Sequence, residues 1–115
     1  MYSSLFMQIK EKVTQWLLQN EEMFRSQNII MEVIENSDER FYVILDFRKC
    51  MSAILVATPD FAPYRFVAFE MAEMVNGTLT MPYSWYDSDD DTIEDIIENL
   101  EKSVNLALEY CRESL

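Results

Sequence analysis

Seven acidic residues lie within the short stretch 87–98, and carboxylates at this density could bind a metal ion. Asp87, Asp89 and Asp91 occupy positions 1, 3 and 5 of a calcium-binding loop. Glu98 occupies position 12, but position 6, where such a loop needs glycine for its sharp turn, is Thr92. The apolar residues that follow recur at helical spacing, which would draw the carboxylates apart along a helix. The sequence therefore disfavours a calcium site, and we predict no metal ligand.

The same acidic stretch has two further interpretations, a capped helix start with a solvated face and a surface for a basic partner. Asp91 and Glu94 have the spacing of a helix-capping pair. From Asp87 onward the chain holds ten acids and two bases, so eight of its twelve net negative charges lie in the last 29 residues. Such concentrated charge costs stability through repulsion, whereas its field speeds association with a cationic protein. The distribution of charge therefore favours a partner-binding surface.

Aromatic residues stand directly before the acidic stretch and extend this candidate surface. Tyr83, Trp85 and Tyr86 lie beside the acids, and aromatic anchors rimmed by charge are common in protein interfaces. Strand alternation could instead direct Trp85 into the core, and both alternatives stay open. The residues that we predict to contact a partner are Trp85, Tyr86, Asp87, Asp89, Asp90, Asp91, Glu94, Asp95 and Glu98.

The remaining reactive residues form no pattern typical of catalysis. Glu70 and Glu73 could in principle act as acid and base in glycoside cleavage, but nothing in the sequence defines a substrate cleft around them. A cysteine nucleophile would need a histidine partner, and the chain has no histidine. Gly77 is the only glycine, so a glycine-rich phosphate loop is ruled out. We therefore predict a binding protein with no enzymatic activity and no cofactor.

The two cysteines, Cys50 and Cys111, match no metal-ligand spacing. A disulfide between them is one alternative, but two buried, reduced thiols are more typical of an intracellular protein. Cys111 also falls on the apolar side of the last predicted helix, which favours a place in the core. The chain has no apolar run of membrane-spanning length, and its first ten residues do not resemble a signal peptide. These features predict a cytoplasmic protein.

The length of 115 residues, half of them hydrophobic, predicts one domain that spans 1–115. Apolar residues from Phe6 to Phe24 recur at helical spacing and predict a helix that ends near Ser26. A second, longer helix follows from the apolar spacing of 93–111. Between the helices, β-branched and aromatic runs predict strands at 29–35, 41–47, 52–58, 64–71 and 78–86.

Turn residues indicate how these strands are connected. Asn76-Gly77 predicts a tight hairpin, and 59–63 predicts a loop. Pro82 places the last strand at a sheet edge or at a break in it. The short links favour antiparallel pairing, because parallel strands need long crossovers. We therefore predict an α+β fold with an N-terminal helix, a four- to five-stranded antiparallel sheet and a long C-terminal helix, both helices packed on one sheet face.

The last predicted strand carries an apolar alternation, with Leu79, Met81, Tyr83 and Trp85 on one face. Met71, Met74 and Met81 surround the predicted hairpin. Methionine side chains can either fill core gaps or form an adaptable binding surface, and core filling is favoured here.

Several short pieces of the sequence lie in a familiar order: 16–20 (WLLQN), 30–33 (IMEV), 43–46 (VILD), 52–56 (SAILV), 83–86 (YSWY) followed by 87–89 (DSD), and 97–100 (IENL). Together they resemble the TriTu-type immunity proteins of bacterial contact-dependent inhibition and related polymorphic-toxin systems. The resemblance implies a small intracellular α+β protein that binds one cognate toxin domain and blocks it. It further implies that the toxin is a nuclease with a basic surface, and some such toxins act together with elongation factor Tu. The residues themselves predict no direct contact with nucleic acid, because the best basic cluster, Arg48-Lys49, is too small, and no membrane contact, because no apolar run is long enough to span one.

A second class, the type III secretion chaperones, also consists of small acidic α/β proteins, which bind an effector as homodimers. Their usual order places a helix between the third and fourth strands. The interval 59–63 is too short for a helix, so the sequence favours the immunity protein over the chaperone.

Overall fold

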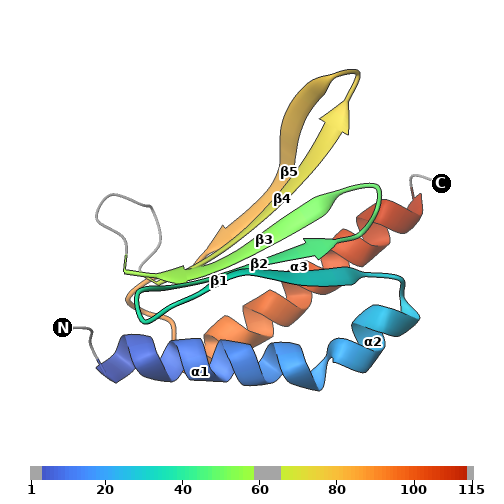
Figure 1. Ribbon diagram of the computed structural model, residues 1–115. Helices are drawn as coiled ribbons and strands as arrows, with labels where there is room; N and C mark the ends of the chain where they lie inside the picture. Colours follow the sequence, from blue (N-terminus) through green and yellow to red (C-terminus); the bar gives the residue numbers. More distant parts are fainter. Residues whose placement is uncertain (1–3, 59–65, 114–115) are drawn as a thin grey trace.

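A computed structural model of the chain describes residues 4–58 and 66–113 (Figure 1). The elements are α1 (Ser4–Gln19), α2 (Glu21–Ser26), β1 (Ile30–Asn36), β2 (Arg40–Asp46), β3 (Met51–Ala57), β4 (Val67–Val75), β5 (Thr78–Tyr86) and α3 (Ile93–Glu113). The strands form one sheet in the order β1-β2-β3-β4-β5, and every neighbouring pair is antiparallel. The predicted α+β fold, with an N-terminal helix, a five-stranded antiparallel sheet and a long C-terminal helix, is confirmed.

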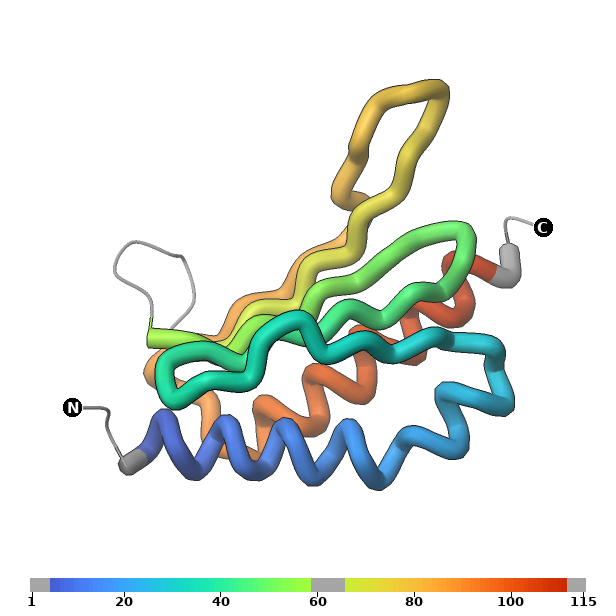
Figure 2. Tube along the Cα trace, in the orientation of Figure 1, coloured from blue at the N-terminus to red at the C-terminus, as the bar shows by residue number. Residues whose placement is uncertain are grey.

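Both long helices cover the same face of the sheet, as Figures 1 and 2 show. Burial alternates along β2 and β3, where every second side chain is withdrawn from solvent against the helices. This is the pattern expected of strands with one covered face, and burial of the apolar side chains is the main stabilising contribution. The fully buried residues that join helices and sheet include Phe6, Ile9, Val13, Val43, Leu45, Ile54, Val56, Phe69, Met71, Ile96 and Leu100.

The first predicted helix is interrupted, which corrects the prediction of a single helix ending near Ser26. The break is at Asn20, whose side-chain amide donates a hydrogen bond to the carbonyl oxygen of Trp16 at 2.7 Å. Asparagine side chains compete with the backbone for such carbonyls and so favour helix ends. α2 then continues for six residues and ends before Asn28, which adopts a left-handed φ of 61°.

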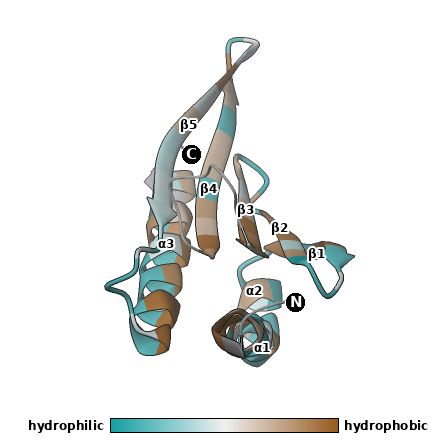
Figure 3. Cartoon of the chain, turned by 90° about the vertical axis from the view of Figure 1, so that its left-hand side faces the viewer, coloured by the Kyte–Doolittle hydropathy of each residue, from teal (hydrophilic) through white to brown (hydrophobic). Residues whose placement is uncertain are grey.

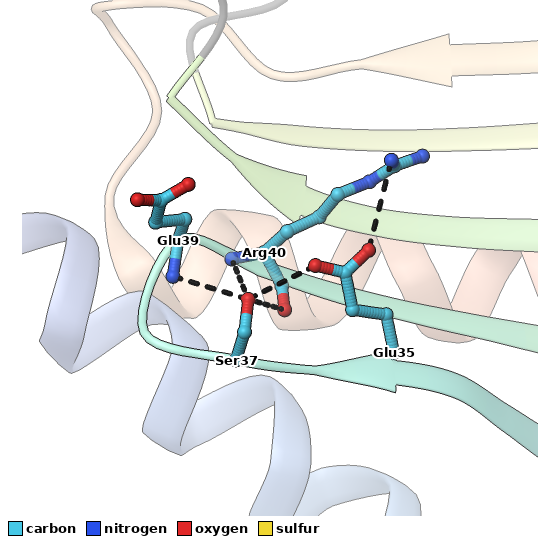
Figure 4. Close-up of polar contacts among 4 residues, drawn as sticks. All are labelled: Glu35, Ser37, Glu39 and Arg40. Carbon is cyan, nitrogen blue, oxygen red and sulfur yellow. Dashed lines mark hydrogen bonds and ion pairs between the residues drawn. The ribbon is translucent and has the colours of Figure 1, made fainter.

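The turn between β1 and β2 is held by Ser37 (Figure 4). Its hydroxyl oxygen accepts hydrogen bonds from the backbone N–H groups of Glu39 and Arg40 at 3.3 and 3.2 Å. The same hydroxyl donates to Glu35 at 3.0 Å, and Arg40 lies 3.7 Å from that carboxylate. The polar residues of this segment therefore fix the connection between the first two strands.

The hairpin of β4 and β5 extends beyond the other strands and rises away from the helices, as Figures 1 and 3 show. Asn76 and Gly77 have φ values of 52° and 79°, which confirms the predicted tight turn with a left-handed backbone. β5 is an edge strand, as Pro82 predicted. The predicted loop 59–63 lies outside the described residues.

β4 runs from Val67 to Val75 and so continues beyond the predicted end at Met71, while the predicted residues 64–65 lie outside the described part of the chain. A register shift accounts for a second difference in this hairpin. Between the pairs Met71↔Tyr83 and Glu73↔Thr80, β5 has one residue more than β4. This bulge reverses the alternation, so Leu79 and Tyr83 do not share the single apolar face that was predicted.

The three methionines around the hairpin consequently differ in their exposure to solvent. Met71 is fully buried in the core, whereas Met74 and Met81 are 62% and 52% exposed near the hairpin turn. Core filling, the favoured prediction, therefore holds for Met71 alone.

Candidate binding surface

Asp87, the first residue of the acidic stretch, is buried and holds the fold. Its Oδ1 atom accepts hydrogen bonds from the backbone N–H groups of Phe66 and Val67, both at 2.9 Å. Its own N–H donates to the carbonyl oxygen of Val67 at 3.1 Å. The side chain is 1% exposed. We therefore assign Asp87 to the connection between the end of β5 and the start of β4 and leave it out of the candidate surface.

Two further acids of the stretch shape the start of α3. Asp91 accepts a hydrogen bond from the backbone N–H of Ser88 at 2.8 Å and so closes a turn. Asp95 accepts from the N–H of Thr92 at 2.9 Å, while the Thr92 hydroxyl accepts from the N–H of Asp95 at 3.1 Å. This reciprocal pair is a capping box. The predicted capping pair of Asp91 and Glu94 is therefore wrong by one residue, because the hydroxyl of Thr92 supplies the cap and Asp91 belongs to the preceding turn.

Four acids of the stretch remain on the surface. Asp89 and Asp90 lie in the turn before α3, and Glu94 and Glu98 lie one helical turn apart on α3. All four side chains are exposed. Glu98 lies 3.2 Å from Lys102, but both side chains are more than 60% exposed, and ion pairs of this kind contribute little. We call Asp89, Asp90, Glu94 and Glu98 the acidic surface.

The aromatic residues do not form one face with these acids. Trp85 pairs with Phe69 across the β4–β5 ladder and is half-buried against the core. Tyr86 has the opposite orientation, and its hydroxyl donates to Glu70 at 2.6 Å. Of the two alternatives for Trp85, the structure therefore supports a place at the edge of the core.

Neither carboxylate constellation considered from the sequence is assembled. The side chain of Asp87 is bonded to β4, while Glu98 lies beyond the first turn of α3. Within residues 4–58 and 66–113, no group of three or more His, Cys, Asp or Glu side chains is placed to hold a metal ion. Glu70 and Glu73 are bonded by Tyr86 of β5 and Tyr110 of α3, respectively, on opposite faces of the sheet. They therefore cannot act together on one substrate.

A polar cluster that the sequence does not reveal lies at the other end of α3. Glu73 is 7% exposed, and its Oε1 accepts a hydrogen bond from the hydroxyl of Tyr110 at 2.5 Å. Lys49 approaches its Oε2 to 3.9 Å. Beside this carboxylate, the sulfur atoms of Cys50 and Cys111 are 2.7 Å apart. Helical spacing identified the apolar side for Cys111, but no sequence signal paired it with the turn before β3.

Burial is the largest cause that raises the pKa of Cys50, to about 12, and the hydrogen bond with Cys111 adds to it. The pKa of Tyr110 is raised as well, first by its hydrogen bond to Glu73. Both shifts favour the protonated, uncharged forms of the Cys50 thiol and the Tyr110 phenol.

Comparison of the chain with models of known protein families, with curated proteins and with solved structures finds no match. Among the helices that the structure describes, none is both long and apolar enough to cross a membrane.

Proposed function

We propose that this chain is an immunity protein that binds a cognate bacterial toxin domain and neutralises it by covering a basic, nucleic-acid-binding active site. The observation that carries the proposal is that the acids at the start of α3 have two different structural roles. Asp87, Asp91 and Asp95 hold the local backbone, and this fixed backbone displays the exposed carboxylates of the acidic surface. The sequence resemblance to TriTu-type immunity proteins supports the same class.

The positive charge that a nuclease needs in its active site is complementary to the acidic surface. A protein that cleaves nucleic acid must hold the phosphate backbone with lysine and arginine side chains. Carboxylates on a fixed backbone meet such cations with the same sign of charge as phosphate. The net charge of −12 adds a field that draws a basic domain toward the chain. If the toxin acts together with elongation factor Tu, this chain contacts the factor only indirectly, through the toxin.

The test is reversal of charge on the acidic surface, with Asp89, Asp90, Glu94 and Glu98 changed together to Lys. The proposal expects the adjacent reading frame to encode a basic toxin domain. Stopped-flow association with that domain should slow by about 10-fold or more at low salt, and the difference should shrink at high salt. The matched control changes four exposed acids elsewhere, Glu22, Glu32, Asp38 and Glu39, to Lys.

The control has the same net charge but keeps the acidic surface, so its association rate should stay closer to that of the wild type. Equal slowing of the two variants would show that only the total charge matters and would move the interface elsewhere. Wild-type association that is independent of salt would contradict the electrostatic argument as a whole.

A second candidate is the homodimeric chaperone of a secreted effector, and the projecting hairpin is the observation that favours it. Met74, Leu79 and Met81 are each more than half exposed there. Sedimentation of the isolated protein separates the candidates. A dimer that dissociates when Leu79 and Met81 are changed to Asp would favour the chaperone, whereas a monomer would favour the immunity protein.

A further inference from the structure

Cys50 and Cys111 are distant in the sequence but adjacent in the fold. Cys50 ends the turn between β2 and β3, and Cys111 lies near the end of α3, which runs beside that turn (Figure 1). Both are free thiols, with their sulfur atoms 2.7 Å apart. A disulfide joins its sulfurs at about 2.05 Å, so closing the bond needs a shift of less than about 1 Å.

One carboxylate holds the two cysteines together. Lys49, the neighbour of Cys50, lies 3.9 Å from Glu73, and Tyr110, the neighbour of Cys111, donates a hydrogen bond to the same side chain. The turn that carries Cys50 is also closed, because its carbonyl oxygen accepts from the N–H of Phe47 at 2.9 Å. The short distance between the sulfurs is therefore maintained from both sides.

The two thiols differ in their access to solvent. Cys50 is 2% exposed, whereas Cys111 is partly exposed and lines a cleft of about 250 Å³. Arg48 and Lys49 line the same cleft. On a chain of net charge −12, Arg48 and Lys49 form a local basic patch beside a reachable sulfur, although Lys49 also lies 3.9 Å from Glu73. Such a patch suits a small disulfide that carries carboxylates, because opposite charges attract one another at short range.

We propose that Cys50 and Cys111 form a dithiol site that reacts with a small anionic disulfide and closes into an intramolecular disulfide. The thiolate of Cys111, having lost its proton to water, attacks one sulfur of the small disulfide. The S–S bond of that molecule breaks, a mixed disulfide forms on Cys111, and one thiolate leaves.

Cys50 then gives up its proton to water, and its thiolate attacks the sulfur of Cys111 and releases the second thiolate. The two released thiolates take up the two protons that the protein thiols lost. In total, two protein thiols are oxidised and one small disulfide is reduced to two thiols. Burial raises the pKa of Cys50 to about 12, which assigns the first attack to Cys111. The bond ties the end of α3 to the β2–β3 turn, far along the helix from the acidic surface.

The experiment incubates the full chain with glutathione disulfide, both in the native state and during refolding from urea in the same buffer. We expect the intact mass to fall by two hydrogens and peptide mapping to join the peptides that carry Cys50 and Cys111. The oxidised protein should melt at a higher temperature than the reduced protein, because the crosslink closes a long loop. Thiols that stay reactive toward a maleimide in both arms would overturn the proposal, and so would a stable glutathione adduct without the bridge.

Two single variants test the assignment of roles. Cys50→Ser leaves the accessible Cys111, which should gain the mass of one glutathione and keep it. Cys111→Ser leaves the buried Cys50, which should react many-fold more slowly in the native state. Equal rates of adduct formation would contradict Cys111 as the first nucleophile. Toxin binding by the oxidised protein is measured separately, and it should be unchanged.

Discussion

The two ends of α3 place acidic groups in opposite surroundings. At the start of the helix, the acidic surface faces water above the cap formed by Thr92 and Asp95. Near its end, Glu73 is nearly buried and bonded to Tyr110, beside two thiols. The acidic surface at the start of α3 can act on a partner at a distance through its electric field. The thiols near the end of α3 can react only with a molecule that enters the cleft beside them. Under the proposed function, acidic residues thus serve association at one end of α3 and local order at the other.

The largest expected effect in this comparison comes from Asp87, the one buried acid at the start of α3. Asp87→Ala should lower the free energy of unfolding by about 3 kcal/mol, because the N–H groups of Phe66 and Val67 lose a buried, charged acceptor. Asp87→Asn keeps the accepting oxygen and should cost clearly less. Urea unfolding measures both changes.

Asp90→Ala is the matched surface control, and it should change the stability by less than about 0.5 kcal/mol. A similar loss from Asp87→Ala and Asp90→Ala would show that the stretch is uniformly solvated. The division between structural and displayed acids would then be wrong.

The next test uses alkaline pH to probe the thiol end of α3. The folded state holds the proton of Cys50 up to a pKa of about 12, compared with an ordinary value of 9.0. The unfolded state then binds fewer protons above pH 9.0, so this contribution to stability is full below that pH and is lost as the pH rises toward about 12. Urea unfolding of the reduced protein should therefore show a stability that falls above pH 9.0.

Two variants separate the groups that titrate there. In Cys50→Ala the decline above pH 9.0 should be shallower than in the wild type. Tyr110→Phe should differ in slope only above pH 10.0, the ordinary pKa of tyrosine, because the pKa of Tyr110 is raised by its bond to Glu73. Identical slopes in all three proteins would mean that this cluster is not formed in solution.

A smaller effect is expected from the helix cap. Thr92→Ala should cost about 1 kcal/mol, because the N–H of Asp95 loses its acceptor at the first turn of α3. Thr92→Ser keeps the hydroxyl and should be close to neutral. If alanine and serine gave the same stability, the acidic surface would not have the fixed backbone that the proposed function needs.

Much of the fold could be predicted because its signals are local. The period of apolar residues located the elements, and the two residues Asn76-Gly77 specified their hairpin. The break at Asn20 and the bulge in β5 were missed for a common reason. Each depends on a hydrogen bond or a strand pairing that competes with a continuous pattern, and the pattern alone cannot show which one prevails.

The candidate site was predictable only where its members are neighbours in the sequence. The acids of 87–98 stood out by density, but the burial of Asp87 depends on its bonds to Phe66 and Val67, 21 and 20 residues upstream. The cluster of Glu73 with the two thiols has no sequence signal, because its members come from three elements. Density of one residue type reveals an exposed surface more readily than a buried cluster.

The smallest predicted effect is a change in stability at Arg48, in the turn that carries Cys50. Arg48 adopts a left-handed φ of 77°, which costs a residue with a side chain about 1–2 kcal/mol. Glycine would avoid this cost, but its greater conformational freedom in the unfolded chain would offset part of the gain in stability. Arg48→Gly should therefore stabilise the protein by about 0.5 kcal/mol in urea unfolding, since the residue-48 N–H still bonds Asp46. Asn28→Gly, at a φ of 61°, should gain less because asparagine tolerates this region.

The same arginine lines the cleft beside Cys111. Arg48→Gly should therefore slow oxidation by glutathione disulfide while it raises stability. Asn28→Gly changes an uncharged residue of the same cleft and should alter the oxidation rate less. Opposite signs for stability and reactivity would show that Arg48 is kept in a costly conformation at a place where its charge acts on an incoming anion. If Arg48→Gly reacted as fast as the wild type, charge would matter at the start of α3 only, and access alone would govern the thiols at its end.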